Sequence, residues 1–243
     1  MSFIAASERQ ALLSAALAGA RNQGMFLQSL ERLTAAFGFT YFALFNAPTK
    51  DDTTLSPLIL DTSMPISFLR EFDRNQYLKT CRLLAPSREC VLPATWQLRD
   101  SQSLSDIDFP RQLQSFLVDR DLGTGFVFSV ISAEGQRLVF WFCGNRNSLG
   151  QSEINELCML ILQALQSYNA IRRNIAALMC ALSAREIEVI RWTSQGKTSV
   201  EIARILSLSD HTVNAYMTNA IRKLDCVNST QLVAKAIRLK LIN

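Results

Sequence analysis

The 243-residue sequence contains a single histidine, His211. A Ser-His-Asp relay would have to use that side chain, and most zinc sites would need it as well. His211 lies in a stretch typical of a helical hairpin near the C-terminus, where neither arrangement is expected. A glycine-rich phosphate loop is also missing. The sequence therefore predicts a protein that is not an enzyme and that has neither a cofactor nor a metal site.

The six cysteines are scattered, and no two of them form a C-x-x-C pair. Metal sites and disulfide scaffolds need close or paired cysteines, so buried free thiols are expected instead. No apolar run reaches the roughly 18 residues that a membrane helix needs. An export signal begins with a basic segment followed by an apolar core, and the first twenty residues do not have this pattern. We therefore expect a cytoplasmic protein without a membrane partner.

The net charge of +4 is unevenly spread along the chain. Residues 1–175 contain sixteen basic and sixteen acidic side chains, whereas residues 176–243 contain nine basic and five acidic ones. All of the excess positive charge thus lies in the last quarter of the chain. This asymmetry points to a polyanionic partner for that segment.

Helical and strand periodicities alternate through the first 170 residues. Strands are expected over 39–47 and 57–62, and the run 125–144 has the pattern of two strands joined at Ala133-Glu134-Gly135. Helices are expected over 6–19, 24–37, 66–85, 108–123 and 152–173. This order predicts an α/β/α sandwich built on a mostly antiparallel sheet.

The remainder of the chain has only helical patterns. Ser183-Ala-Arg-Glu186 and Thr198-Ser-Val-Glu201 both fit the capping box that begins a helix. Four helices are expected, and the second and third form a helix-turn-helix. The predicted fold is therefore α+β, with the sandwich over 1–171, a linker over 172–181 and an all-α four-helix domain over 182–243.

A helix-turn-helix places its second helix in the major groove of DNA. Polar side chains on the outer face of that helix would meet base edges and phosphates, and the free amides that begin the preceding helix can hold a phosphate. The predicted DNA-binding residues occupy these places: Lys197, Thr198, His211, Thr212, Asn214, Ala215, Thr218, Arg222 and Lys223. The alternative is an ordinary solvated face of a small helical bundle.

Residues 182–242 closely resemble the DNA-binding domain of LuxR-family transcription regulators. Matching residues are dense, among them Leu182, Glu186, Gly196, Ile202 and Leu224. The resemblance implies that the fourth helix helps to pair two such domains, so that a homodimer would place two recognition helices on two DNA half-sites. Two positions depart from the family: Tyr216 stands where histidine is usual, and Lys240 stands where glycine is usual.

The N-terminal segment is similar to the autoinducer-binding domain of quorum-sensing LuxR regulators. The similarity rests on Trp96 in LPATW and on Gly125 in DLGTGF, which precedes the predicted hairpin. It implies an acyl-homoserine lactone held between sheet and helices by a tryptophan, a tyrosine and an aspartate. Those three positions fall here on Phe68, Phe72 and Cys81, and the hairpin position that often carries serine or threonine falls on Trp141. With the two matches they form the candidate ligand-binding set: Phe68, Phe72, Cys81, Trp96, Gly125 and Trp141.

Three interpretations of this segment remain open at this point. It binds a different small-molecule effector, it has no ligand and its aromatic residues fill the core, or it binds a lactone in an altered pose. Without the carboxylate, the lactone's amide would lose about 1.5–3 kcal/mol. The function hypothesis is a DNA-binding homodimer that regulates transcription. The alternative is an antagonist that forms a heterodimer with a related regulator.

Overall fold

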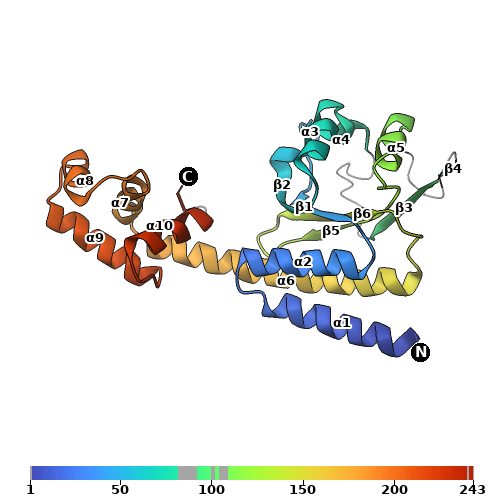
Figure 1. Cartoon of the computed structure of the whole chain (residues 1–243), viewed down its shortest axis with the longest axis horizontal. Coiled ribbons are helices and arrows are strands. Elements are labelled where there is room, and N and C mark those ends of the chain that lie inside the picture. The colour runs from blue at the N-terminus through green and yellow to red at the C-terminus, as the bar shows by residue number, and fades with distance from the viewer. Residues whose placement is uncertain (1, 82–91, 100–101, 104–108, 240, 243) are drawn as a thin grey trace. The chain divides into compact units, whose positions relative to one another are not determined.

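The computed structural model describes residues 2–81, 92–99, 102–103, 109–239 and 241–242 (Figure 1). The chain divides into two compact units, Met1–Asn169 and Ala170–Asn243. The first unit contains the sheet, and the second is entirely helical. The predicted α+β class is confirmed.

The first unit is built on a six-stranded sheet with the order β2-β1-β6-β5-β3-β4. Every pair of neighbouring strands is antiparallel. The strands are β1 Tyr41–Asn46, β2 Ile59–Thr62, β3 Ala94–Arg99, β4 Gln102–Ser103, β5 Thr124–Ile131 and β6 Arg137–Gly144. The predicted hairpin is confirmed as β5 and β6, and Gly135 in its turn has a φ of +79°. That left-handed backbone conformation favours glycine.

Helices cover both faces of the sheet, which gives the three layers that the sequence predicts (Figure 1). One face carries α3 Ile66–Arg74, α4 Tyr77–Thr80 and α5 Arg111–Val118. The other carries α2 Gln23–Ala36 and the first part of α6 Gln151–Ala181, and α1 Ser2–Gly19 packs beside them. A short 3-10 helix, η1 Ser56–Leu58, precedes β2. Because β6 is buried on both faces, its sequence LVFWFC is continuously apolar instead of alternating.

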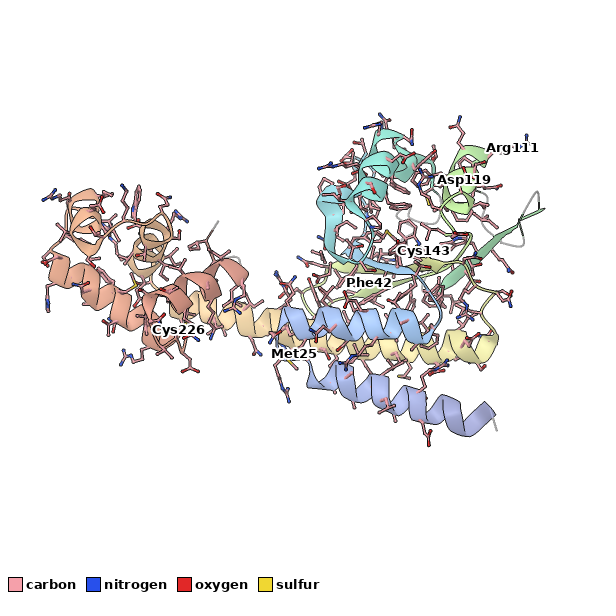
Figure 2. All side chains as sticks on the ribbon, viewed as in Figure 1. Met25, Phe42, Arg111, Asp119, Cys143 and Cys226 are labelled. Carbon is pink, nitrogen blue, oxygen red and sulfur yellow. The ribbon has the colours of Figure 1, made fainter. Side chains whose placement is uncertain are left out.

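Side chains fill the space on either side of the sheet (Figure 2). Phe42 and Cys143, both labelled there, point to opposite faces, because Phe42 lies directly across from Phe142 and successive side chains alternate. The face of Cys143 carries Ala43, Trp96 and Trp141 toward α3 and α5, in one buried cluster. This cluster contains most of the predicted ligand-binding set.

The structure of the first unit differs from the prediction in two places. The helical stretch 66–85 is broken after Arg74, because Gln76 takes a left-handed conformation with φ of +53°, and its last residues, 82–85, lie outside the described part. The strand β3 was not predicted at all. Its sequence ATWQLR alternates apolar and polar residues, which is a strand signal, and it pairs with β5 over residues far apart in the chain.

The second unit consists of the end of α6 and four further helices. These are α7 Ala184–Ser194, α8 Ser199–Leu206, α9 Asp210–Lys223 and α10 Ser229–Arg238. Both predicted capping boxes form, at Ser183 with Glu186 and at Thr198 with Glu201. The segment 172–181, predicted as a linker, continues α6 as helix. Two buried clusters hold the helices together, one centred on Ile190, Ala220 and Leu232 and the other on Ile202 and Val213.

Gly125 lies directly across from Trp96 in the pairing of β5 with β3. A Cβ added at Gly125 would come within 1.9 Å of the Trp96 ring atom Cζ2, so the indole occupies the space that a side chain would need. The glycine is therefore required by the packing of Trp96.

Replacing Gly125 by alanine is expected to lower the free energy of unfolding by at least about 2–3 kcal/mol, because the ring must leave its position in a close-packed cluster. Urea unfolding followed by circular dichroism measures the change. The matched control is Gly19→Ala, where the added Cβ meets no atom within 4 Å. That change is expected to stay within about 1 kcal/mol of the parent. Equal stability of the two variants would contradict the packing role.

Candidate DNA-binding and effector sites

The helix-turn-helix is formed by α8 and α9, joined by Ser207, Leu208 and Ser209. Ser207 ends α8 with a φ of +54°, and the Leu208 amide donates back to the carbonyl of Ala203 over 2.9 Å. Ser209 then caps α9, because its hydroxyl accepts from the Thr212 amide over 3.0 Å. The tight turn is thus stabilised by local hydrogen bonds on both sides.

The recognition helix α9 turns Val213 and Ala220 into the core. Six of the predicted DNA-binding residues are exposed on this helix, which are His211, Asn214, Ala215, Thr218, Arg222 and Lys223. Thr212 is half-buried, and its hydroxyl lies 2.8 Å from that of Ser209. Asn214 Oδ1 accepts from the Ser199 hydroxyl over 2.8 Å, which ties the two helices together across the exposed side.

Lys197 and Thr198 lie exposed at the start of α8. The Lys197 ammonium is 3.6 Å from Glu201, and the Thr198 hydroxyl donates to the same carboxylate over 2.9 Å. The Thr198 amide also donates to it, and this hydrogen bond is the main cause that holds the pKa of Glu201 below its ordinary value. The side of α8 that would face a phosphate therefore has one lysine, partly balanced by one carboxylate.

Lys223 is exposed on α9, as predicted, but its side chain also has a partner on α7. Its ammonium donates to both carboxylate oxygens of Glu186, over 2.9 and 2.7 Å. Glu186 is only 2% exposed, and its carboxylate also accepts from the Ser183 amide over 2.6 Å. The ion pair links α9 to α7. The phosphate contact of Lys223 stays a prediction, because 33% of its side chain is exposed.

Opposing influences act on the pKa of Glu186. Burial raises it, while the hydrogen bond and charge of Lys223 and the capping contacts with Ser183 lower it, and the net result is a pKa below the ordinary value. A carboxyl group with a lowered pKa in the folded state stabilises the fold above its unfolded pKa, which is about 4.3. That contribution is lost as the pH falls through the lowered pKa.

Replacing Lys223 by methionine is expected to lower the free energy of opening of α7 and α9 by about 2–3 kcal/mol. This is less than the 3–5 kcal/mol of a fully buried pair, because the lysine is partly exposed. Hydrogen exchange of the α7 and α9 amides in the full chain measures the change. The control is the neighbouring exposed position, with Arg222→Met expected to stay within about 0.5 kcal/mol.

The pH dependence provides a second readout of the same variant. With the ammonium gone, the buried carboxylate is easier to protonate, so the deficit of Lys223→Met should shrink as the pH falls from 7 toward 4. A deficit that stays constant over this range would mean that packing, and not the charge pair, is lost.

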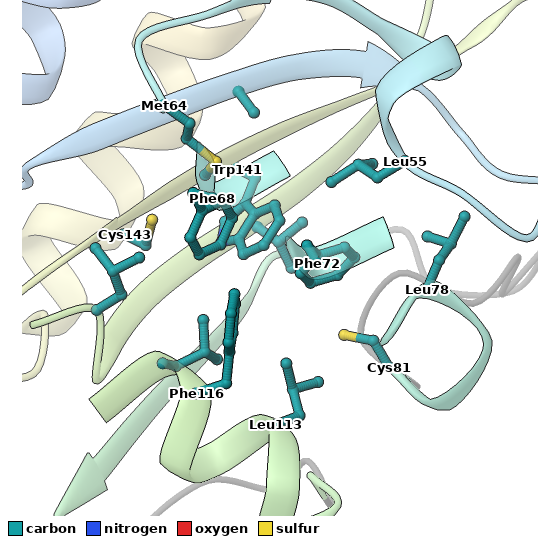
Figure 3. Close-up of a cluster of buried hydrophobic side chains, with 14 of the residues drawn as sticks. Leu55, Met64, Phe68, Phe72, Leu78, Cys81, Leu113, Phe116, Trp141 and Cys143 are labelled. Atoms are coloured by element: carbon teal, nitrogen blue, oxygen red, sulfur yellow. The ribbon is translucent and has the colours of Figure 1, made fainter. Parts of the chain in front are cut away.

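The predicted ligand-binding residues lie together on one face of the sheet (Figure 3). Phe68 and Phe72 project from α3, Cys81 follows α4, and Trp96 and Trp141 come from β3 and β6. All five are buried, and Gly125 lies under the Trp96 ring. Trp141 is 6.0 Å from Phe72, 6.4 Å from Phe68 and 6.2 Å from Trp96, measured between ring centroids.

Several residues of this cluster were missed by the sequence analysis. Phe116 of α5 lies 5.1 Å from Phe68 and 4.9 Å from Tyr77, and Phe45 of β1 lies 6.4 Å from Trp141. The amphipathic pattern of 108–123 identifies Phe116 as buried, but nothing local shows which cluster it joins.

The acidic residue nearest to this region, Asp73, has other partners. Its carboxylate accepts from the amides of Leu55 and Ser56 over 2.5 and 3.1 Å, and from the Ser56 hydroxyl. It therefore fixes the start of η1. In the described part of the N-terminal unit, no aspartate or glutamate is buried.

Both tryptophans of the cluster have a buried indole nitrogen, Nε1, without a hydrogen-bond partner. Each residue is 2% exposed. The cluster thus combines aromatic packing with two unsatisfied N–H donors, which is an uncommon arrangement in a protein core.

Three further observations concern metal ligands, membrane helices and a buried thiol. Within the described ranges, no three histidine, cysteine, aspartate or glutamate side chains are grouped so that they could hold a metal ion. Among the same residues, no helix combines the length and the apolar character needed to cross a membrane. Burial raises the pKa of the Cys143 thiol, so it is protonated at neutral pH.

Comparison with known proteins adds two family matches. Residues 180–236 match the bacterial regulatory proteins of the luxR family, and residues 23–170 match the autoinducer binding domain. The transcriptional activator protein SolR of Ralstonia nicotianae is 33% identical over 193 residues, which cover 76% of this chain and 78% of that protein. BjaR1 of Bradyrhizobium diazoefficiens, also a transcriptional activator protein, is 27% identical over 223 residues, or 89% of each chain.

A solved structure of SdiA in complex with octanoyl-rac-glycerol superposes with a TM-score of 0.50 at 21% identity, covering 96% of this chain and 94% of that one. It shows that the fold is shared. The curated relatives are transcriptional regulators, which confirms the prediction that the chain is not an enzyme. From the helix-turn-helix geometry and the two family matches, we conclude that the chain belongs to the LuxR family of transcription regulators, with an autoinducer-binding domain before a helix-turn-helix DNA-binding domain.

Proposed function

We propose that this chain binds duplex DNA as a homodimer in the cytoplasm and regulates transcription under the control of its N-terminal unit. The observation that carries the proposal is the exposed polar face of α9, which presents His211, Asn214, Thr218 and Arg222 on a helix anchored from behind by the Glu186–Lys223 pair. A helix held in this way can enter a groove without losing its own packing.

Along α9, the proposed DNA-binding residues divide into those that contact bases and those that contact phosphates. His211, Asn214, Ala215 and Thr218 lie in its first two and a half turns, the part that meets base edges in a helix-turn-helix, with Thr212 at their border. Arg222 lies in the last turn, where a phosphate would follow. Lys197, beside Thr198 at the start of α8, is proposed to contact a second phosphate.

The pairing of two chains is proposed to use α10. Ile237 is 50% exposed on this helix, and Val233, one turn earlier, is only partly buried. Residues four apart share a helix face, so the two side chains form an apolar strip that a second α10 could cover. This agrees with what the family resemblance implies for the fourth helix.

The N-terminal unit is proposed to respond to an effector other than a typical acyl-homoserine lactone. Phe68, Phe72 and Cys81 stand where the resemblance implies tryptophan, tyrosine and aspartate, and Trp141 adds a large ring. SdiA, which shares the fold, was solved with octanoyl-rac-glycerol, which is not a lactone.

DNA binding is tested by the salt dependence of affinity. Replacing Arg222 by alanine should weaken binding to all duplexes alike and make the slope of log K against log salt shallower by about one unit, because one phosphate contact is lost. Titration of a labelled duplex at several salt concentrations measures this. Arg185→Ala, an exposed arginine on α7 paired with Glu188, is the control and should leave the slope unchanged. If no duplex is bound at any salt concentration, the proposal is wrong.

Pairing through α10 predicts that Ile237→Glu weakens the dimer at least about tenfold, because a carboxylate would be buried opposite its own copy. Sedimentation velocity over a range of concentrations measures the dissociation constant. Ile205→Glu places the same charge at a similarly exposed isoleucine of α8 and serves as the control. If the change at Ile237 leaves the dissociation constant of the dimer unaltered, the proposed interface at α10 is wrong.

A further inference from the structure

The two unpaired indole donors belong to one cluster. Trp96 and Trp141 come from different strands, yet their rings lie 6.2 Å apart and cross at 59°. In the described part of the chain, the remaining buried side-chain nitrogen or oxygen without a partner is Gln163 Oε1, which lies on α6. A buried donor without an acceptor is energetically unfavourable, so two of them in neighbouring rings indicate that an acceptor is missing from this cluster.

The cluster itself supplies little that could accept these hydrogen bonds. Its buried members are aromatic and aliphatic side chains, two thiols and the Met64 thioether. The sulfur atoms are only weak hydrogen-bond acceptors. The Tyr77 hydroxyl is directed to the carbonyl of Gln112. The carboxylate of Asp73 is used at the start of η1. The chemistry around the two indoles is therefore that of a donor pair in an apolar surrounding.

We propose that the effector of this unit is an apolar molecule whose polar group contains acceptor oxygens only, such as an alkyl ester or ketone, and that Trp96 and Trp141 both donate to it. The inference rests on the proposed function, since it gives a chemical class to the effector of the N-terminal unit. It deepens that proposal by stating what the polar group must contain and what it must lack.

The same reasoning predicts weaker binding for a ligand with an amide N–H at this point. Cys81 stands where the resemblance implies the carboxylate that takes the amide proton, and no carboxylate is buried in the described part of the unit. The carbonyl of an amide could accept from the two indole N–H groups, but the amide's own N–H would then be buried without an acceptor. Phe68, Phe72 and Phe116 provide apolar contacts for an alkyl chain, and binding would replace ring–ring contacts by ring–chain contacts of similar burial. The selectivity then comes from the two donors.

Nuclear magnetic resonance of the intact, unmodified chain tests the proposal directly. The sequence has three tryptophans, Trp96, Trp141 and Trp192, so a sample labelled with ¹⁵N-tryptophan shows three indole N–H signals. Single Trp→Phe variants assign them. Methyl decanoate is the probe, and decane is the control of similar chain length without an acceptor. We expect the ester to move the Trp96 and Trp141 signals downfield, as hydrogen bonding does, and to leave Trp192 unchanged. Decane should produce no downfield shift.

A matched pair of probes measures the selectivity. N-methyldecanamide has the same acyl chain as methyl decanoate but adds one N–H, and we expect it to bind at least about tenfold more weakly. Trp96→Phe and Trp141→Phe should each reduce the preference for the ester. Phe45→Leu perturbs the packing of the same cluster without removing a donor, so its preference should remain that of the parent.

Three results would overturn the inference: indole signals that the ester does not move, equal affinity for the ester and the amide, or indole signals that are already at hydrogen-bonded positions without a ligand. Duplex binding measured on the same sample separates the two proposals. Intact DNA binding together with any of these results rejects only the effector class, whereas lost DNA binding rejects the proposed function.

Discussion

The buried ion pair between Glu186 and Lys223 fixes the geometry on which DNA recognition depends. It joins the first turn of α7 to the last turn of α9, and the same carboxylate accepts from the Ser183 amide that begins α7. One buried charge therefore organises a helix start, a helix end and the angle between two helices. Because removing one partner leaves the other charge buried and unpaired, such a pair specifies the arrangement strongly even where its net contribution to stability is small.

The ion pair between Glu186 and Lys223 also affects the charge of the exposed face of α9. Lys223 is partly exposed, but its charge is paired with Glu186, and Lys197 at the start of α8 is partly balanced by Glu201. Arg222 therefore supplies much of the cationic character of the exposed face of α9. The face offers more hydrogen-bonding groups than charge. We therefore expect base contacts to contribute a large share of its selectivity, with phosphate contacts coming from few positions.

The N-terminal unit follows a different principle, in which ring volume decides the arrangement. Trp96 lies over Gly125, and Trp141 stands between Phe68, Phe72 and Phe45. The packing leaves two indole N–H groups unsatisfied, so the cluster is well filled but incompletely paired. A core of this kind can be stable and still gain from a molecule that brings acceptors.

Much of this could be predicted from the sequence because it depends on local signals. The capping boxes, the β5–β6 hairpin and the helix-turn-helix all follow from residues a few positions apart. The alternation in ATWQLR also indicates the strand β3, which the predictions left out, but its pairing with β5 is not a local signal. The pairing of Lys223 with Glu186 could not be predicted, because the two residues are 37 positions apart in the sequence. Likewise, ring contacts such as that of Phe116 with Phe68 depend on how distant elements pack.

The single histidine offers the most direct test of the central claim, that the exposed face of α9 binds duplex DNA. His211 lies in the first turn of α9, so the one set of imidazole proton signals in the spectrum reports from the predicted groove-facing end. Adding a duplex should shift or broaden these signals, and high salt should reverse the effect. A duplex that binds while the His211 signals stay unchanged would contradict the account.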